Sequence, residues 1–93
     1  GAIEEAIMKG LAKEGKNPTD GPSLALIADE RDPGKPRLVV FLIGDETQEE
    51  INDLLKSTGF SRLVKVSEVR KIEEIPLMGT GKTDYRRLQG MIA

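Results

Sequence analysis

The sequence predicts a small α+β domain, in which a three-stranded, mainly antiparallel sheet has three helices packed on it. Apolar residues recur at three- and four-residue spacing in three segments, as in helices that bury one face. Short apolar runs between these segments predict strands, so the order is helix, strand, strand, helix, strand, helix. A chain of 93 residues is long enough for a single domain with one modest core.

The first half of the chain is expected to contain one helix and two strands. Ile3, Ile7 and Leu11 lie four residues apart and form the apolar stripe of a helix that we expect to end at Gly15. The runs 24–28 and 38–43 are apolar, and a charged turn that contains two prolines separates them. We therefore expect two adjacent, largely buried antiparallel strands.

A second helix begins with a recognisable start signal. Thr47 and Glu50 have the three-residue spacing of a capping box, in which each side chain accepts a hydrogen bond from the other residue's backbone amide. We expect this helix to end at Gly59. Its inner face is predicted to consist of Ile51, Leu54 and Leu55.

A third strand and a third helix complete the prediction. Three residues begin an extended segment: Leu63, Val64 and Val66. The strand itself is expected over residues 68–73, and the last helix is expected from Asp84, whose side chain can cap the first turn. The inner side of that helix is predicted to hold Tyr85, Leu88 and Ile92.

The composition excludes several kinds of chemistry. The chain has no cysteine and no histidine, and hence no disulfide, thiolate nucleophile, zinc site of the usual kind or histidine base. Aromatic residues make up 3% of the chain, too few to stack the bases of single-stranded nucleic acid. We expect no metal site and no nucleic-acid partner. The absence of cysteine is typical of the cytoplasm, and no apolar run approaches the length of a membrane span.

Charge is unevenly distributed along the chain. Residues 1–60 carry seven basic and twelve acidic side chains, a net charge of −5, whereas residues 61–93 carry seven basic and four acidic ones, a net charge of +3. The basic third contains Lys82, Arg86 and Arg87 beside a glycine-containing turn, where a positive field favours an anion such as a phosphate. We expect the two arginines to lie on the solvated side of the last helix.

The stretch with the most chemical content is 75–85, which reads Ile-Pro-Leu-Met-Gly-Thr-Gly-Lys-Thr-Asp-Tyr. Gly79 and Gly81 free the backbone of a turn, and Lys82 follows directly. A phosphate-binding P-loop would need a glycine where this chain has Pro76, which has no amide proton. The residues alone leave two interpretations: a plain connection between strand and helix, or a loop that presents Lys82 to an anion.

The same stretch resembles the adenylate-forming enzymes, which include acyl-CoA synthetases, nonribosomal peptide synthetase adenylation domains and luciferases. The last shared motif of that superfamily is matched position by position by Pro76, Thr80, Gly81, Lys82, Asp84 and Leu88. The preceding order of helices and strands is also similar, so the resemblance covers nearly the whole chain. It is to the C-terminal domain, a lid that takes two orientations on a large N-terminal domain.

A narrower resemblance is to the bacterial bifunctional 2-acylglycerophosphoethanolamine acyltransferase/acyl-[acyl carrier protein] synthetases. Most members of the superfamily have an aliphatic residue after the lysine and an arginine after the aspartate, whereas this chain has Thr83 and Tyr85. The run 78–82, the short connection 29–36 and the strand that begins at Leu38 also look most like that group. The resemblance implies a cytoplasmic protein, at the cytoplasmic face of the inner membrane if the acyltransferase is fused upstream, with no direct membrane insertion by this domain.

The resemblance also implies a mechanism and partners. Lys82 would stabilise the charge that develops when a fatty carboxylate attacks the α-phosphate of ATP. Gly79 and Gly81 are assigned to loop geometry, and Thr80 either to a polar contact near ATP or to the turn alone. ATP and Mg²⁺ would be bound mainly by the N-terminal domain, and acyl carrier protein or CoA would accept the acyl group. We therefore expect residues 1–93 to be a single C-terminal lid, excised from a longer ligase without its N-terminal domain and hinge, and inactive alone.

Two other functions are open from the sequence. One is the lid of an acyl-CoA ligase or another adenylating enzyme, which differs in the acceptor rather than in the first half-reaction. The other is a noncatalytic module that docks a carrier protein through the basic third of the chain. The lid and the docking module differ in whether adenylation depends on Lys82.

Overall fold

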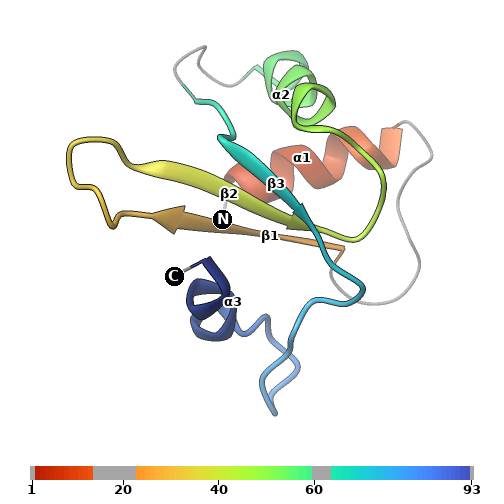
Figure 1. Ribbon diagram of the computed structural model, residues 1–93. Coiled ribbons are helices and arrows are strands. Elements are labelled where there is room, and N and C mark those ends of the chain that lie inside the picture. Colours follow the sequence, from red (N-terminus) through yellow and green to blue (C-terminus); the bar gives the residue numbers. More distant parts are fainter. Residues whose placement is uncertain (1, 14–22, 60–63, 93) are drawn as a thin grey trace.

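The computed structural model describes residues 2–13, 23–59 and 64–92, and it confirms the predicted α+β class and order of elements. The helices and strands are α1 (Ala2–Lys13), β1 (Leu24–Asp29), β2 (Arg37–Leu42), α2 (Gln48–Ser57), β3 (Glu68–Lys71) and α3 (Tyr85–Ile92). Figure 1 shows the sheet between two helical layers, with α1 and α2 on one face and α3 on the other.

The three strands form one mixed sheet in the order β1-β2-β3. β1 and β2 pair antiparallel as predicted, with Leu24 opposite Leu42 and Asp29 opposite Arg37. β3 pairs with β2 in the parallel direction, with Val39 opposite Glu68. Parallel neighbours need a crossover connection, and α2 lies within that connection.

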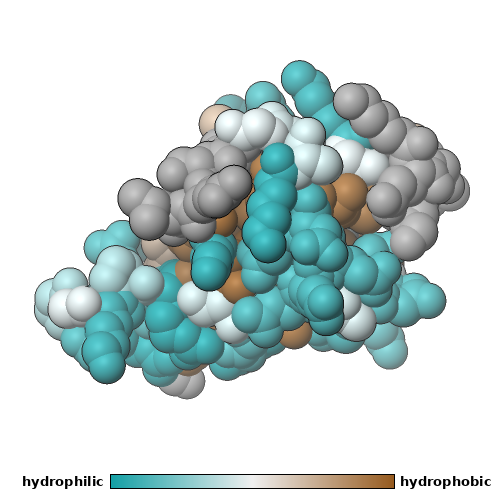
Figure 2. Space-filling model, turned by 90° about the horizontal axis from the view of Figure 1, so that it is seen from above, coloured by the Kyte–Doolittle hydropathy of each residue, from teal (hydrophilic) through white to brown (hydrophobic). Residues whose placement is uncertain are grey.

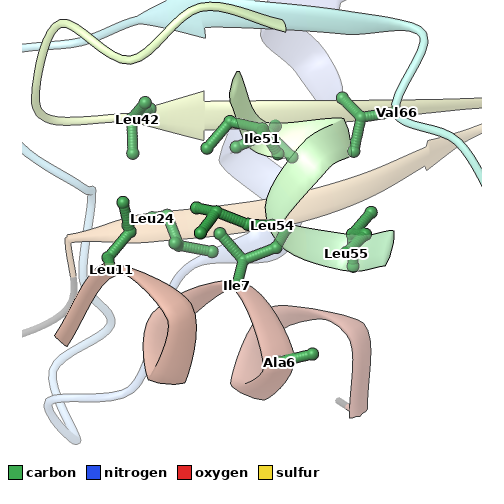
Figure 3. Close-up of a cluster of buried hydrophobic side chains, with 10 residues drawn as sticks. Ala6, Ile7, Leu11, Leu24, Leu42, Ile51, Leu54, Leu55 and Val66 are labelled. Carbon is green, nitrogen blue, oxygen red and sulfur yellow. The ribbon is translucent and has the colours of Figure 1, made fainter. Parts of the chain in front are cut away.

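Both faces of β1 and β2 are buried, which explains why their sequences are continuously apolar rather than alternating. Successive side chains point to opposite faces, so each strand contributes to two clusters. Figure 3 shows the cluster under α1 and α2, whose labelled members are Ala6, Ile7, Leu11, Leu24, Leu42, Ile51, Leu54, Leu55 and Val66. The cluster under α3 consists of Ala25, Ile27, Val39, Phe41, Ile75, Leu88 and Ile92.

The predicted inner faces of α1 and α2 are confirmed. Ile7 and Leu11 are buried, and Ile3 packs half-buried against the same cluster. α1 approaches α2 closely at Gly10, where an added Cβ would lie 2.8 Å from Cδ2 of Leu54. The stop predicted at Gly15 lies outside the described residues.

The capping box at the start of α2 is present. The Thr47 hydroxyl oxygen accepts from the Glu50 amide at 3.1 Å, and the Glu50 carboxylate accepts from the Thr47 amide at 3.1 Å. At the other end α2 stops at Ser57, and Gly59 follows with a φ of +86°. This positive φ favours glycine, which agrees with the prediction that Gly59 ends the helix.

Some predicted boundaries differ from the structure. β2 ends at Leu42, although the Ile43 amide still donates to the carbonyl of Ser23. β3 ends at Lys71 rather than at residue 73, because only one further amide, that of Ile72, bonds to β2. Leu63, expected at the start of the preceding extended segment, lies outside the described residues.

Side-chain amides of α2 hold the segment that enters β3. Asn52 accepts from the Val66 amide at 2.7 Å and donates to the Val66 carbonyl at 3.1 Å, and Gln48 donates to the same carbonyl at 3.0 Å. Val66 is itself buried. The backbone of Val66 is therefore satisfied by side chains, whereas the next amide, that of Ser67, already donates to the carbonyl of Leu38 in β2.

Replacing Asn52 with alanine is expected to lower the free energy of unfolding by about 1–3 kcal/mol, because the buried Val66 amide loses its acceptor. Urea unfolding of the 93-residue chain measures the change. Asp53→Ala, an exposed substitution on the same helix, is the matched control and should change stability little. Equal effects of the two substitutions would contradict the role of Asn52.

A cluster of charged side chains lies at the end of the sheet next to the β1–β2 turn. The buried carboxylate of Asp29 accepts from Nε and Nη2 of Arg31 at 2.9 and 2.8 Å, and Arg37 pairs with Glu68 at 3.0 Å. The Arg31 hydrogen bonds lower the pKa of Asp29 from its ordinary 3.8 to about 2. The hydrogen bond from Arg70 likewise lowers the pKa of Glu68.

Acid should therefore destabilise the fold through Asp29. A carboxyl group with a lowered folded-state pKa stabilises the protein above its unfolded pKa, and this contribution is lost as the pH falls through about 2. Thermal unfolding of the chain from pH 5 to pH 2 should show a smaller loss of stability in Asp29→Asn than in the wild type. Parallel curves for the two chains would show that Asp29 contributes nothing to the acid dependence.

Candidate catalytic loop

Residues 76–84 form a small hairpin between β3 and α3. At its base the Asp84 amide donates to the Pro76 carbonyl at 2.8 Å, and above it the Met78 amide donates to the Lys82 carbonyl at 2.7 Å. The Gly81 amide donates to the Met78 carbonyl at 2.9 Å and closes the turn. The loop predicted from the sequence thus has a defined backbone, with Lys82 directly after the turn.

The two glycines of the loop differ in what the backbone requires of them. Gly81 has a φ of +88°, a conformation that L side chains rarely adopt. Gly79 is not among the glycines with positive φ, and a Cβ added to it would meet no atom within 4 Å. The turn geometry therefore depends on glycine at position 81 and not at position 79.

Lys82 and Thr80 both lie on the exposed surface of this hairpin. Within the described part of the chain, no hydrogen bond or ion pair engages the ammonium group of Lys82 or the hydroxyl of Thr80. Figure 1 shows the hairpin extending away from the sheet, beyond α3. The geometry leaves the ammonium free to contact a group outside this domain.

The C-terminal side of the hairpin is joined to the core through α3. The Asp84 carboxylate accepts from the Arg87 amide at 3.1 Å, so Asp84 caps the helix as predicted. Leu88 and Ile92 are buried against the sheet, whereas Tyr85, predicted on the same inner side, is 44% exposed. Arg86 and Arg87 are exposed, in agreement with the solvated side predicted for them.

Exposed apolar side chains surround the hairpin, and sequence periodicity did not reveal them. Among the described residues, the large hydrophobic side chains that are exposed are Leu77, Met78, Tyr85 and Met91. All four belong to the hairpin or α3. The sequence did contain one indication of these exposed side chains. Two apolar residues, Leu77 and Met78, lie between Pro76 and Gly79 in a turn that is too short to have a core of its own.

An open hollow of about 700 Å³ lies beside the hairpin. Its lining residues are Lys71, Ile72, Glu73, Glu74, Ile75, Pro76, Leu77, Arg87 and Met91. Figure 2 shows a different surface, seen from above the view of Figure 1, where hydrophilic side chains cover most of the described atoms. The hairpin side of the domain thus combines exposed apolar groups, a hollow and an unpaired cation.

No helix in residues 2–13, 23–59 or 64–92 has the length and apolar character needed to cross a membrane.

Comparison with solved structures shows which proteins share this fold. The K483A mutant of the amide bond synthetase McbA from Marinactinospora thermotolerans matches with a TM-score of 0.73 and 14% identity, over 99% of this chain and 18% of that one. MbtA from Mycobacterium smegmatis matches with a TM-score of 0.73 and 12% identity, over 95% of this chain and 16% of that one. This chain therefore has the same fold as the part of each of these proteins that it covers.

A further structure with this fold is an acyl-CoA synthetase (AMP-forming)/AMP-acid ligase II-like protein from Dyadobacter fermentans. It matches with a TM-score of 0.67 and 11% identity, over 99% of this chain and 26% of that one. The present chain therefore spans between 16% and 26% of the length of these three structures. The sequence matches no protein-family model, and no curated protein matches it.

Proposed function

We propose that this chain is the C-terminal lid of an AMP-forming acyl ligase and that Lys82 is its catalytic residue. The observation that carries the proposal is the ammonium of Lys82, exposed on a hairpin and unpaired among the described residues, in a domain with this fold. Leu77, Met78 and Tyr85 flank it as exposed apolar surface that an N-terminal adenylation domain would cover.

The proposed chemistry needs a positive charge rather than a base. A carboxylate oxygen of the fatty acid bonds to the α-phosphorus of ATP, and pyrophosphate leaves from the same phosphorus. Negative charge increases on the phosphoryl oxygens in the transition state, where a preorganised cation is most effective. Lys82 serves as a compact point charge, and no proton has to move. This agrees with a chain that has no histidine.

The 93 residues are proposed to be a lid without activity of their own. They supply one cation, whereas ATP, Mg²⁺ and the acyl chain would be bound by the N-terminal domain of the full-length protein. Gly81 maintains the hairpin geometry, and the exposed Thr80, two residues before Lys82, is assigned either a polar contact near ATP or a role in the turn alone. Acyl-adenylate formation by the 93-residue chain alone would contradict this division of roles.

The finer proposal is an acyl-[acyl carrier protein] synthetase fused to a 2-acylglycerophosphoethanolamine acyltransferase, in the cytoplasm. Its support is the resemblance of the run 78–82 and the aromatic Tyr85 to that group. An acyl-CoA ligase is the second candidate, because Brucella canis acyl-CoA synthetase shares the fold with a TM-score of 0.66.

Exchange of labelled pyrophosphate into ATP by the full-length protein tests the ligase directly. We expect exchange that depends on a fatty acid, and its absence across a series of chain lengths would contradict the proposal. Acyl carrier protein and CoA should then be compared as acceptors. Transfer to CoA alone would overturn the acyl carrier protein assignment and leave the ligase assignment intact.

A further inference from the structure

β1 is an edge strand, and its free edge is covered by a side chain from α1. The Ile43 amide bonds to Ser23, and hydrogen-bonded positions alternate along an antiparallel pair, so the Leu26 amide points away from β2. Oε2 of Glu4 accepts a hydrogen bond from this amide at 2.6 Å. Glu4 thus satisfies an outward amide that would otherwise be open to solvent.

The same carboxylate also contacts the helix that follows the hairpin. The Tyr85 hydroxyl lies 2.8 Å from Oε1 and 2.9 Å from Oε2 of Glu4, and it donates its proton to that carboxylate. Tyr85 is the first residue of α3, which packs on the opposite face of the sheet from α1. Glu4 therefore connects the two helical layers around the edge of β1.

Tyr85 stands at the point where the hairpin meets α3. Its amide donates to the Thr83 carbonyl at 3.1 Å, and its neighbour Asp84 closes the base of the hairpin through the Pro76 carbonyl. Lys82 is three residues earlier in the chain. A hydrogen bond that fixes the position of the Tyr85 ring therefore also fixes the part of the hairpin that leads into α3.

We propose that Glu4 and Tyr85 form a latch that fixes the orientation of the Lys82 hairpin, so that both are positioning residues for adenylation. The inference rests on the proposed function of Lys82. A misplacement of about 1 Å in a catalytic group can cost a hundredfold in rate, so a single anchoring bond near the loop has a measurable effect. Among the described residues, no side chain of the hairpin itself makes a hydrogen bond to α1, so Tyr85 is its nearest anchor to that helix.

The phenol is suited to act as a permanent donor in this latch. Burial, together with the hydrogen bond to the Glu4 carboxylate, raises the pKa of Tyr85 to about 12, so the hydroxyl keeps its proton near neutral pH. Phenylalanine has the same ring but no donor, which makes Tyr85→Phe a change of one hydrogen bond.

The latch itself is tested in the 93-residue chain by near-ultraviolet absorbance. Tyr85 is the single tyrosine and the chain has no tryptophan, so the signal above that of phenylalanine belongs to this ring alone. Glu4→Ala removes the carboxylate acceptor and should shift the tyrosine band, whereas Gln89→Ala should not. Gln89 is the matched control because it lies on the same helix and donates to the Ala28 carbonyl of the same strand. Identical spectra for wild type and Glu4→Ala would overturn the latch.

Its effect on catalysis is tested in the full-length protein. Tyr85→Phe should lower kcat for acyl-adenylate formation by about three- to tenfold, the effect of one hydrogen bond, with KM for ATP unchanged. Glu4→Ala should lower kcat by at least as much, because it also removes the acceptor of the Leu26 amide. The double variant should be no slower than Glu4→Ala alone, because Glu4→Ala already removes the hydrogen bond between the two side chains. Transfer from preformed acyl-adenylate should be unaffected. Equal losses in both half-reactions would mean a purely structural role and would overturn the positioning role.

The two proposals fail in different ways. If Lys82→Ala abolishes adenylation while Tyr85→Phe and Glu4→Ala leave it intact, the positioning role is wrong and the function of Lys82 stands. If adenylation does not depend on Lys82, the proposed function is wrong, and the positioning role falls with it. The absorbance of Tyr85 still decides whether the latch forms.

Discussion

Replacing Lys82 with alanine in the full-length protein is expected to slow acyl-adenylate formation by about a hundred- to a thousandfold, the usual effect of removing one preorganised transition-state contact. The ammonium of Lys82 has no partner among the described residues, so its loss removes no side-chain hydrogen bond or ion pair there. The effect should therefore appear in kcat rather than in folding. Single-turnover measurement of acyl-adenylate from fatty acid, ATP and Mg²⁺ gives the rate.

Arg86→Ala is the matched control for that experiment. It removes one positive charge from the same exposed region, four residues away, and should leave adenylation close to the wild-type rate. Lys82→Arg keeps the charge but replaces a compact ammonium with a planar guanidinium, and it should recover only part of the activity. Equal losses for Lys82→Ala and Arg86→Ala would mean that general positive charge, rather than Lys82, supports the reaction.

Replacing Leu88 with alanine is expected to lower the free energy of unfolding by about 2–5 kcal/mol, because it leaves a cavity under α3. Leu88 has no exposed surface and belongs to the cluster that attaches α3 to the sheet. A domain of this size has a total stability of about 5–15 kcal/mol, so the variant should lose a large share of it. Urea unfolding of the 93-residue chain, followed by circular dichroism, measures the change.

Met91→Ala provides the comparison on the same helix. Met91 is 45% exposed, and its truncation should cost far less than that of Leu88. A similar loss for both substitutions would contradict the burial pattern of α3. A small loss of stability in Leu88→Ala would mean that the cluster under α3 does not attach this helix to the sheet.

Local signals in the sequence predicted most of the elements because each depends on neighbouring residues. The capping box of Thr47 and Glu50 involves groups three residues apart, and the stripe of Ile7 and Leu11 reports the 3.6-residue helical period. Asp84 likewise caps a helix from an adjacent position. The fold class follows from the order of such elements.

Features that depend on distant residues could not be read in the same way. The β2–β3 pairing is parallel, but the apolar pattern of a short strand does not encode its direction. Tyr85 was expected inside because it continues the spacing of Leu88 and Ile92, yet its hydroxyl instead reaches Glu4, 81 residues away in the chain. A tyrosine at the end of a helix can keep its ring against the fold while its hydroxyl bonds at the surface.

The position of the candidate lysine was predictable, but its surroundings were not. Glycines around Lys82 indicated a turn, and the structure locates the left-handed conformation at Gly81 alone. The hollow beside the hairpin is lined by residues from 71 to 91, which only the packing of α3 brings together.

The most direct test of the central claim is acyl transfer from preformed acyl-adenylate by the full-length Lys82→Ala variant. If Lys82 acts only while the carboxylate and ATP react, transfer to the acceptor should proceed near the wild-type rate. Adenylate formation by the same variant should be slower by about a hundred- to a thousandfold. Loss of both half-reactions together, or retention of both, would contradict a lysine that serves adenylation alone.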